Sequence, residues 1–246
     1  MRISTKIFLL ALLVLAVCLG SYDEKLAAEF RKGEYTNPYY GYVQMKYKDF
    51  DEVELRSATS ANVMLVRGDF KVLMHPQASD FVVVRQEGKR LIIEAKFQDH
   101  LRSVNARHMF FISCPKLKVF QSDAEYQIGS VGVKDFVNWN LWWWPTTIRG
   151  FSQDTMTIRE EHASNVVMEG DTIKRFTAVL GAEADKENGP VLTLGQGNHF
   201  DSTNLDILSN GRLWVKGTDI RQLTYHLADS ASISVNGVSA RYLNLH

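Results

Sequence analysis

One alternating pattern recurs through the last third of the chain. Short apolar strands end in glycine at Gly170, Gly195, Gly217 and Gly237, at intervals of 25, 22 and 20 residues. A repeat in this range is a signature of solenoid folds. Because every unit consists of strands and turns alone, the pattern predicts an all-β chain that coils into a single-stranded parallel β-helix.

Stacked coils of a β-helix place like residues above one another, about 4.8 Å apart. The alternating runs that begin at Leu205 and Leu223, and a further one at 242–245, lie between or after the glycine-closed strands. We expect Leu205, Leu223 and Leu243 to form one interior ladder. Val215 and Val235 would form another.

The segment from Phe50 onward also predicts strands and no long amphipathic helix, so we expect a strand-rich part that caps the β-helix at its N-terminal end. Short apolar runs at 53–55, 63–66, 70–73, 81–85 and 91–95 are separated by turn-forming residues. The sequence Gln-Glu-Gly-Lys-Arg at 86–90 predicts a tight hairpin between two of them.

These strands follow one another in an order that resembles a known bacterial family. The matching motifs are Val53-x-Leu55, Val63-x-Leu65-x-x-Gly68-Asp69-Phe70-x-Val72, Gly88-x-x-Leu91-x-Ile93 and Ile112-x-x-Pro115-x-Leu117. They resemble the auto-transporter adhesin head, or GIN domain, over roughly residues 50–246. The resemblance implies a right-handed parallel β-helix, an envelope location and no established catalytic residues. One departure is the polar segment 122–126, where the family has small glycine- and serine-rich turns.

The N-terminus predicts export. Arg2 and Lys6 precede an apolar run over 7–19, and small residues follow it at Gly20 and Ser21. A basic start, a short apolar core and small residues are typical of a secretory signal. Cys18 closes a stretch that resembles a lipobox, although Val17 stands where that motif prefers a small residue. Ordinary cleavage, lipidation at Cys18 and an uncleaved anchor all remain open.

We therefore expect three segments: a signal over 1–20, a spacer over 21–48, and a β-helical, GIN-like domain over 49–246. The body would carry an insertion at 136–150. The chain contains 28 basic and 28 acidic residues, so its formal net charge is zero. This balance argues against nucleic acid as the partner and leaves contact with a membrane to the N-terminal segment or a lipid. Cys114, in an apolar strand ended by Pro115, is expected to be a small buried side chain.

The insertion holds a tryptophan cluster, formed by Trp139, Trp142, Trp143 and Trp144. Neighbouring residues of a strand point to opposite faces, so the indoles cannot all point inward. Exposed aromatic rings commonly contact partners or sugars. The cluster is thus a candidate ligand-binding site. The alternative is a structural cap over an end or flank of the solenoid.

Acidic residues offer weaker candidates. Glu183, Asp185 and Glu187 form the densest group and could hold a cation loosely, but such a run is more often a solvated loop. No histidine or cysteine motif for zinc, phosphate-binding loop or dinucleotide fingerprint occurs, so no cofactor is expected.

The sequence favours a non-catalytic, exported protein of the bacterial cell envelope that recognises a glycan or a surface protein. Rows of Asn, Ser, Thr and Asp along a flat face would offer repeated hydrogen-bonding groups. One alternative is a glycan-cleaving enzyme with acids around Asp185 and Asp201, which would require acids and bases to converge in one groove. The other is a structural module that assembles with copies of itself.

Overall fold

The computed structural model describes residues 3–101, 107–135, 145–182, 189–237 and 239–241. The chain divides into two compact units, Met1–Gly41 and Tyr42–His246. Tryptophans 139 and 142–144, and the acidic residues 183, 185 and 187, fall outside the described residues.

The first unit is mainly one helix, α1 (Ile3–Lys32), followed by a short 3-10 helix at Glu34–Thr36. At 1.5 Å per residue, 30 residues extend about 45 Å. None of the described side chains of α1 is buried within the structure, and the helix is long and apolar enough to cross a membrane. It continues through Gly20 and Ser21 and ends at Gly33, whose φ of 69° suits a helix-terminating glycine.

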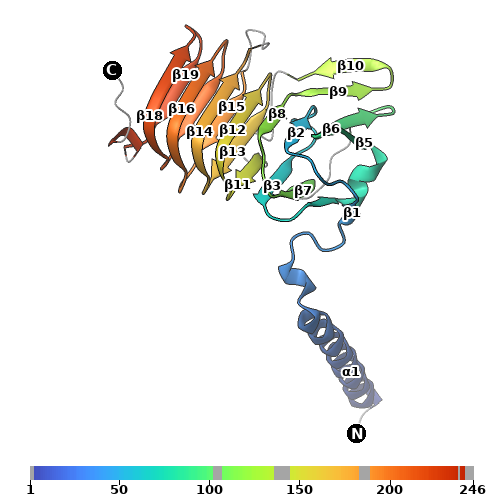
Figure 1. Cartoon of the computed structure of the whole chain (residues 1–246). Coiled ribbons are helices and arrows are strands. Elements are labelled where there is room, and N and C mark those ends of the chain that lie inside the picture. The colour runs from blue at the N-terminus through green and yellow to red at the C-terminus, as the bar shows by residue number, and fades with distance from the viewer. Residues whose placement is uncertain (1–2, 102–106, 136–144, 183–188, 238, 242–246) are drawn as a thin grey trace. The chain divides into compact units, whose positions relative to one another are not determined.

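The second unit is mostly β. Within the described residues its strands form a nine-stranded and a ten-stranded sheet (Figure 1). The nine-stranded sheet contains β1 (Val43–Met45), β4 (Lys71–Met74), β7 (Phe110–Cys114), β3 (Val63–Arg67), β11 (Thr146–Arg149), β13 (Asn165–Glu169), β15 (Val191–Leu194), β17 (Arg212–Val215) and β19 (Ser232–Val235), in that spatial order.

The ten-stranded sheet contains β10 (Val131–Lys134), β9 (Glu125–Ile128), β6 (Arg90–Phe97), β2 (Glu52–Leu55), β8 (Val119–Ser122), β12 (Ser152–Glu160), β14 (Thr172–Leu180), β16 (His199–Ile207) and β18 (Asp219–Leu227). A further strand, β5 (Val82–Glu87), pairs with β6. Short 3-10 helices lie at Pro76–Asp80 and Ser239–Arg241.

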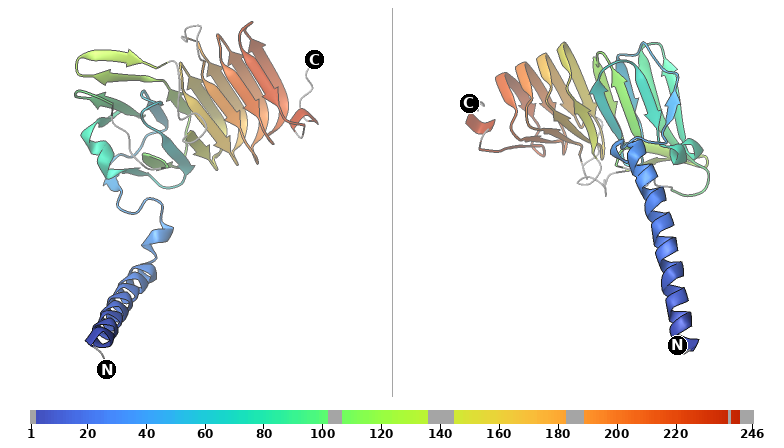
Figure 2. Two further views of the ribbon diagram at one scale, coloured as in Figure 1. Left: turned by 180° about the vertical axis from the view of Figure 1, so that it is seen from behind. Right: turned by 90° about the horizontal axis from the view of Figure 1, so that it is seen from below.

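From β11 to β19 the chain alternates between the two sheets. Each strand pairs in parallel with the next strand of its own sheet, so the strands succeed one another in chain order (Figures 1 and 2). The inward side chains of both sheets form one apolar core. Phe176 and Phe200 are fully buried in it and stack with ring centroids 4.6 Å apart.

The expectation of a right-handed, single-stranded parallel β-helix is wrong. The two sheets are mixed and do not close into a solenoid. Strand β4 pairs antiparallel with both β1 and β7, and hairpins join β5 to β6 and β9 to β10. The periodic pattern of the last third reflects the parallel strands alone. It contains no information on the antiparallel pairing of the first half, which decides the fold class.

Sharp corners separate the alternating strands. Gly150, Gly170, Gly197 and Gly217 all have positive φ, between 66° and 86°. Gly195, which closes a strand in the repeat pattern of the sequence, does not have a positive φ. A Cβ at this position would lie 2.9 Å from the Met168 carbonyl oxygen. Gly195 is therefore required by a close backbone approach, and the turn itself falls two residues later.

Buried polar side chains bridge successive corners. The Phe151 amide donates to Asp171 Oδ1 (2.7 Å), and the Asp171 amide donates to Asn198 Oδ1 (2.9 Å). Asn198 Nδ2 in turn donates to Thr218 Oγ1 (3.3 Å) and to the Met168 carbonyl (2.9 Å). Because burying an unpaired polar group costs free energy, this chain of bonds fixes how the corners stack.

The register confirms one of the expected ladders and corrects the other. Val215 is aligned with Val235, as predicted. Leu205 is aligned with Tyr225, whereas Leu223 is aligned with Thr203. The two leucines therefore occupy neighbouring columns rather than one, and Leu243, the third expected member, lies outside the described residues.

Candidate functional site

A polar surface covers the outer side of four strands of the ten-stranded sheet, β12, β14, β16 and β18. Because side chains alternate along a strand, buried Ile158, Ala178 and Leu205 point into the core and their neighbours point outward. We call the outward set the polar face: Thr155, Thr157, Arg159, Arg175, Thr177, Val179, Ser202, Asn204, Asp206, Gln222, Thr224 and His226.

The parallel register arranges the polar face in columns. Thr157 is aligned with Thr177, Thr177 with Asn204, and Asn204 with Thr224. Adjacent strands lie about 4.8 Å apart, and alternate residues of one strand are about 6.6 Å apart. This column therefore repeats a hydroxyl or amide group at the spacing of the strands, whereas the columns beside it include Arg159, Arg175 and Asp206.

Charged pairs line one margin of the polar face. Lys174 Nζ lies 2.8 Å from Asp154 Oδ1, and Arg221 Nη1 lies 3.0 Å from Asp201 Oδ1. The hydrogen bond with Asp154 raises the pKa of Lys174, and the same bond lowers the pKa of Asp154. All four side chains are exposed, so these pairs stabilise the fold little. Their alternating signs favour the observed register.

The outer surface continues from the polar face to strands β8, β2 and β6. Thr157 is aligned with Val119, Val119 with Glu52, and Glu52 with Arg90. Arg90 Nε lies 3.0 Å from Glu52 Oε2, and this hydrogen bond raises the pKa of Arg90. The column of hydroxyl and amide groups thus leads toward a group of paired charges.

The ten-stranded sheet divides into two branches where β2 ends, one formed by β2 and β6 and the other by β6 and β9. Strand β2 pairs with β6 up to Leu55, whereas β6 pairs with β9 only from Lys96. Between these two regions the hydroxyl of Ser57 accepts a hydrogen bond from the Ala95 amide (2.8 Å) and donates one to the Glu125 carbonyl (2.6 Å). The buried Ser57 side chain thus joins the two branches, beside the backbone bonds from the Arg56 amide to the Ile93 carbonyl and from the Glu125 amide to the Arg56 carbonyl.

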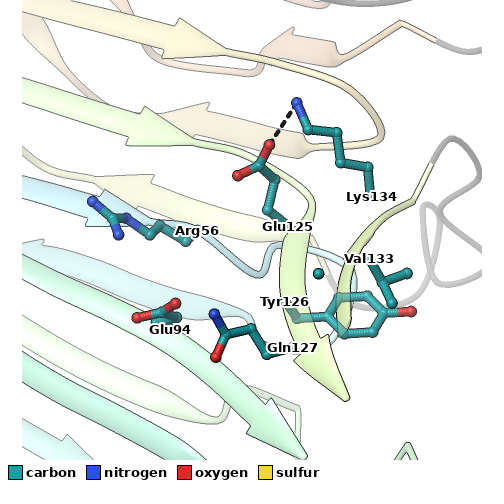
Figure 3. Close-up of a pocket in the computed structure, with 8 residues that line it drawn as sticks. Arg56, Glu94, Glu125, Tyr126, Gln127, Val133 and Lys134 are labelled. Carbon is teal, nitrogen blue, oxygen red and sulfur yellow. Dashed lines mark ion pairs between the residues drawn. The ribbon is translucent and has the colours of Figure 1, made fainter. Parts of the chain in front are cut away.

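A groove opens on the outer side of this fork (Figure 3). It has a volume of about 510 Å³, within the usual range for small-ligand sites. We call it the fork groove; its lining residues are Arg56, Glu94, Glu125, Tyr126, Gln127, Gly132, Val133 and Lys134.

The charges of the fork groove are paired. Lys134 Nζ lies 2.6 Å from Glu125 Oε1, and Arg56 Nε lies 2.6 Å from Glu54 Oε1. Glu94 Oε2 accepts a hydrogen bond from Arg85 Nη1 at 3.0 Å. Two lining carboxylates thus balance two lining cations.

The tyrosine of the groove belongs to the core rather than to its open side. The ring of Tyr126 points away from Arg56 and Glu94 (Figure 3) and meets Phe97 edge-on at 5.7 Å. Burial, together with Asp135 3.1 Å from its hydroxyl, raises the pKa of Tyr126 to about 12. It therefore supports the hairpin and supplies no exposed aromatic platform.

A buried histidine–aspartate pair lies elsewhere in the body. His162 Nδ1 is 2.6 Å from Asp123 Oδ1, and the imidazole is 1% exposed. Burial raises the pKa of Asp123, and His162 opposes this shift. Because a substrate cannot reach an enclosed imidazole, this pair is a structural contact.

The acids proposed for a glycan-cleaving enzyme do not meet among the described residues. Asp201 pairs with Arg221 at the margin of the polar face, Asp206 lies on the face, and Asp171 is buried at a corner. No group of three or more metal-binding side chains occurs in the described part of the chain. Asp185, the other acid of that hypothesis, lies outside it.

The remaining predicted sites have mixed outcomes. Trp139, Trp142, Trp143 and Trp144 lie outside the described residues, so their role in binding stays a prediction. The same holds for Glu183, Asp185 and Glu187 as cation ligands. Cys18 is exposed on α1, and its lipidation is likewise untested.

Cys114 is buried, as expected, and burial raises the pKa of its thiol to about 12. Sequence reasoning missed the fork groove. Its lining residues come from β6, β9, β10 and the residue directly after β2, and they share no motif. The only signal in the sequence is the unusual polar segment 122–126, which leads into β9.

No family model matches the chain, and no curated protein matches it. Among solved structures, a protein provisionally named an adhesin from Bacteroides fragilis shares 12% identity, with a TM-score of 0.48 over 80% of this chain and 93% of its own. A provisionally named adhesin from Parabacteroides distasonis shares 13% identity, with a TM-score of 0.38 over 80% and 94%. A provisionally named lipid-binding protein from that species shares 13%, with a TM-score of 0.35 over 79% and 96%. None of these similarities transfers a function to this chain.

Proposed function

We propose that the protein is an exported, non-catalytic component of a bacterial cell envelope that binds a glycan through its polar face. The observation that carries this proposal is one column of aligned hydroxyl and amide side chains across β12, β14, β16 and β18, formed by Thr157, Thr177, Asn204 and Thr224. A polymer lying across the strands would meet an equivalent group at each strand.

The composition of the polar face favours a glycan over a protein partner. The cores of protein interfaces are rich in aromatic residues and methionine. The polar face has one apolar member, Val179, among twelve positions; Arg159, Arg175 and Asp206 are charged, and the other eight side chains carry a hydroxyl, amide or imidazole group. Sugar hydroxyls both donate and accept hydrogen bonds, which suits such a surface.

The N-terminal unit supports the location. An exposed helix with an apolar run over 7–19 could serve as a cleaved signal, as the site of lipidation at Cys18, or as an anchor. The motif resemblance to GIN domains, a family without established catalytic residues, agrees with an envelope location and with a binding role.

A binding screen tests the function. Full-length protein in detergent is applied to a glycan array and to purified envelope polysaccharide, beside a variant that carries Thr177→Lys and Asn204→Lys. We expect wild-type protein to bind at least one extended glycan and the variant to bind at least tenfold more weakly.

The matched control carries Ser232→Lys and Ser234→Lys, which add the same charge to exposed positions of β19 in the other sheet. It should bind as the wild type does. Absence of glycan binding by wild-type protein, or equal loss in both variants, would contradict the proposal.

A further inference from the structure

The fork groove contains hydrogen-bonding groups that the fold leaves unused. Arg56 uses Nε for Glu54, and none of the described residues accepts a hydrogen bond from its Nη atoms. The Glu94 carboxylate uses Oε2 for Arg85 and Lys96, which leaves Oε1 open in the described structure. Gln127 makes no side-chain hydrogen bond within the described residues, so its amide offers both a donor and an acceptor.

The open groups of the fork groove favour a neutral ligand with several hydroxyl groups. They combine donors and acceptors on planar guanidinium, carboxylate and amide groups, and the charges among the lining residues balance. The carboxylates of Glu94 and Glu125 would repel an anionic ligand, and the cationic side chains of Arg56 and Lys134 would repel a cationic one. A neutral ligand with several hydroxyl groups would be repelled by neither pair of side chains. Vicinal hydroxyls of a sugar ring also match the paired atoms of such planar groups.

The position of the groove agrees with this ligand. Arg56 and Glu94 lie on the same outer surface as the polar face, since Leu55 and Ile93 beside them are aligned and buried. A chain bound along the polar face therefore points toward the charged strands that end at the groove. Polar and apolar atoms share the lining of the groove about equally, and its apolar side chain, Val133, is partly buried against the core.

We propose that the fork groove binds one ring of a neutral sugar, as a separate subsite at the end of the polar face. This inference rests on the proposed glycan-binding function and adds a second contact to it. The subsite would favour an uncharged ring over a uronic acid or an amino sugar with a free amine.

Gly132 provides a way to fill the groove without changing its charge. A Cβ at this position meets no atom within 4 Å, and its backbone lies outside the positive-φ region. Gly132→Trp should therefore fold and occupy the space of the ring. Gln127→Ala is a second variant, which removes the open amide and leaves the groove empty. Val131→Trp is the matched control, because Val131 belongs to the same strand, is 62% exposed and does not line the groove.

The test uses full-length protein in detergent and saturation-transfer NMR with neutral hexoses and N-acetylhexosamines, a uronic acid and glucosamine. We expect wild-type protein and Val131→Trp to bind at least one neutral sugar. Gly132→Trp should lose the signal, and Gln127→Ala should bind at least fivefold more weakly. Unchanged binding in Gly132→Trp, absence of neutral-sugar binding by wild-type protein, or preference for a charged sugar would overturn the proposal.

The two proposals fail in different ways. If the Thr177→Lys, Asn204→Lys variant loses polymer binding while the groove variants bind every sugar as the wild type does, the polar face is a site and the groove is not. If no polymer binds wild-type protein but a neutral monosaccharide binds and Gly132→Trp abolishes it, the groove is a site and the polar-face function is wrong.

Discussion

Glu160 is the least favourably placed side chain of the described core. It is fully buried at the end of β12, and neither carboxylate oxygen has a hydrogen-bond partner. Its neighbour across the sheet, Ser122, also has an unpartnered hydroxyl. Burial raises the pKa of Glu160 well above its usual value, and the adjacent Glu161 carboxylate acts in the same direction. The folded protein therefore favours the protonated, neutral acid.

This placement predicts a stability that falls as pH rises. The folded state holds the Glu160 proton more tightly than the unfolded state, so its contribution is fully present below about pH 4.5 and is lost as pH rises toward the folded pKa. Each unit of pKa difference corresponds to about 1.4 kcal/mol. We expect Glu160→Gln to raise the Tm at pH 7.5 and to change it little at pH 4. Thermal melts across this range, with exposed Asp229→Asn as control, measure the effect; a pH-independent difference would contradict the interpretation.

Asp171 is a second buried carboxyl whose protonation should affect stability, over a narrower range of pH. Burial raises its pKa to about 7, although the Phe151 amide bond opposes the shift. Stability from this residue should decline between about pH 4 and pH 7. Asp171→Asn keeps an oxygen for the Phe151 amide, so we expect a flatter profile in that range without loss of fold. If Asp171→Asn is unfolded at every pH, the fold requires the carboxyl group itself and not only an oxygen that accepts the hydrogen bond from the Phe151 amide.

At the scale of elements, the fork depends on Ser57. Its hydroxyl connects β6 to β9 through two hydrogen bonds, and the residue is fully buried. Ser57→Ala leaves the Ala95 amide without this acceptor, which should cost about 1–3 kcal/mol. Urea unfolding measures the loss against Ser79→Ala, which removes an exposed local bond to the Pro76 carbonyl. Equal effects of the two substitutions would show that the fork does not rely on Ser57.

Gly195 tests the close packing of successive strands. An alanine Cβ would lie 2.9 Å from the Met168 carbonyl oxygen, whereas one at Gly132 would meet nothing within 4 Å. Relieving such a clash by shifting the backbone costs about 1–3 kcal/mol. We therefore expect Gly195→Ala to lower the stability and Gly132→Ala to leave it unchanged or slightly higher. Similar midpoints for the two variants in urea unfolding would rule out the tight contact.

The sequence predicts elements better than their arrangement. Alternation located the strands because it reflects which side of each strand is buried, and Val215 and Val235 are aligned because the strands β17 and β19 begin at matching positions. Leu205 and Leu223 were misaligned because the pattern fixes faces but not the offset between strands. The fork groove was beyond prediction, since Arg56, Glu94 and Glu125 come together only through the pairing of β2, β6 and β9.

At the scale of the molecule, two chemically different units share one chain. The helix α1 offers apolar side chains to its surroundings, whereas the polar face and the fork groove offer hydrogen-bonding groups. A helix of this composition is stable in a membrane and a polar sheet surface is stable in water. The body also has its own continuous core, whose buried members come from residues 50–220. Attachment and recognition are therefore expected to be separable.

This separation leads to a prediction about the full chain in a bacterial host. If α1 or a lipid at Cys18 holds the protein to a membrane, deletion of residues 1–41 should release a body that melts within about 2 °C of the full chain, because the core lies in the other unit. Cys18→Ser distinguishes the two attachments: the variant stays in the membrane fraction if the helix is the anchor and leaves it if the lipid is. Mass spectrometry of the mature N-terminus checks the third possibility, since cleavage near Gly20 would yield a shortened chain in the soluble fraction. A large drop in Tm on deletion would show instead that the body depends on its N-terminal unit.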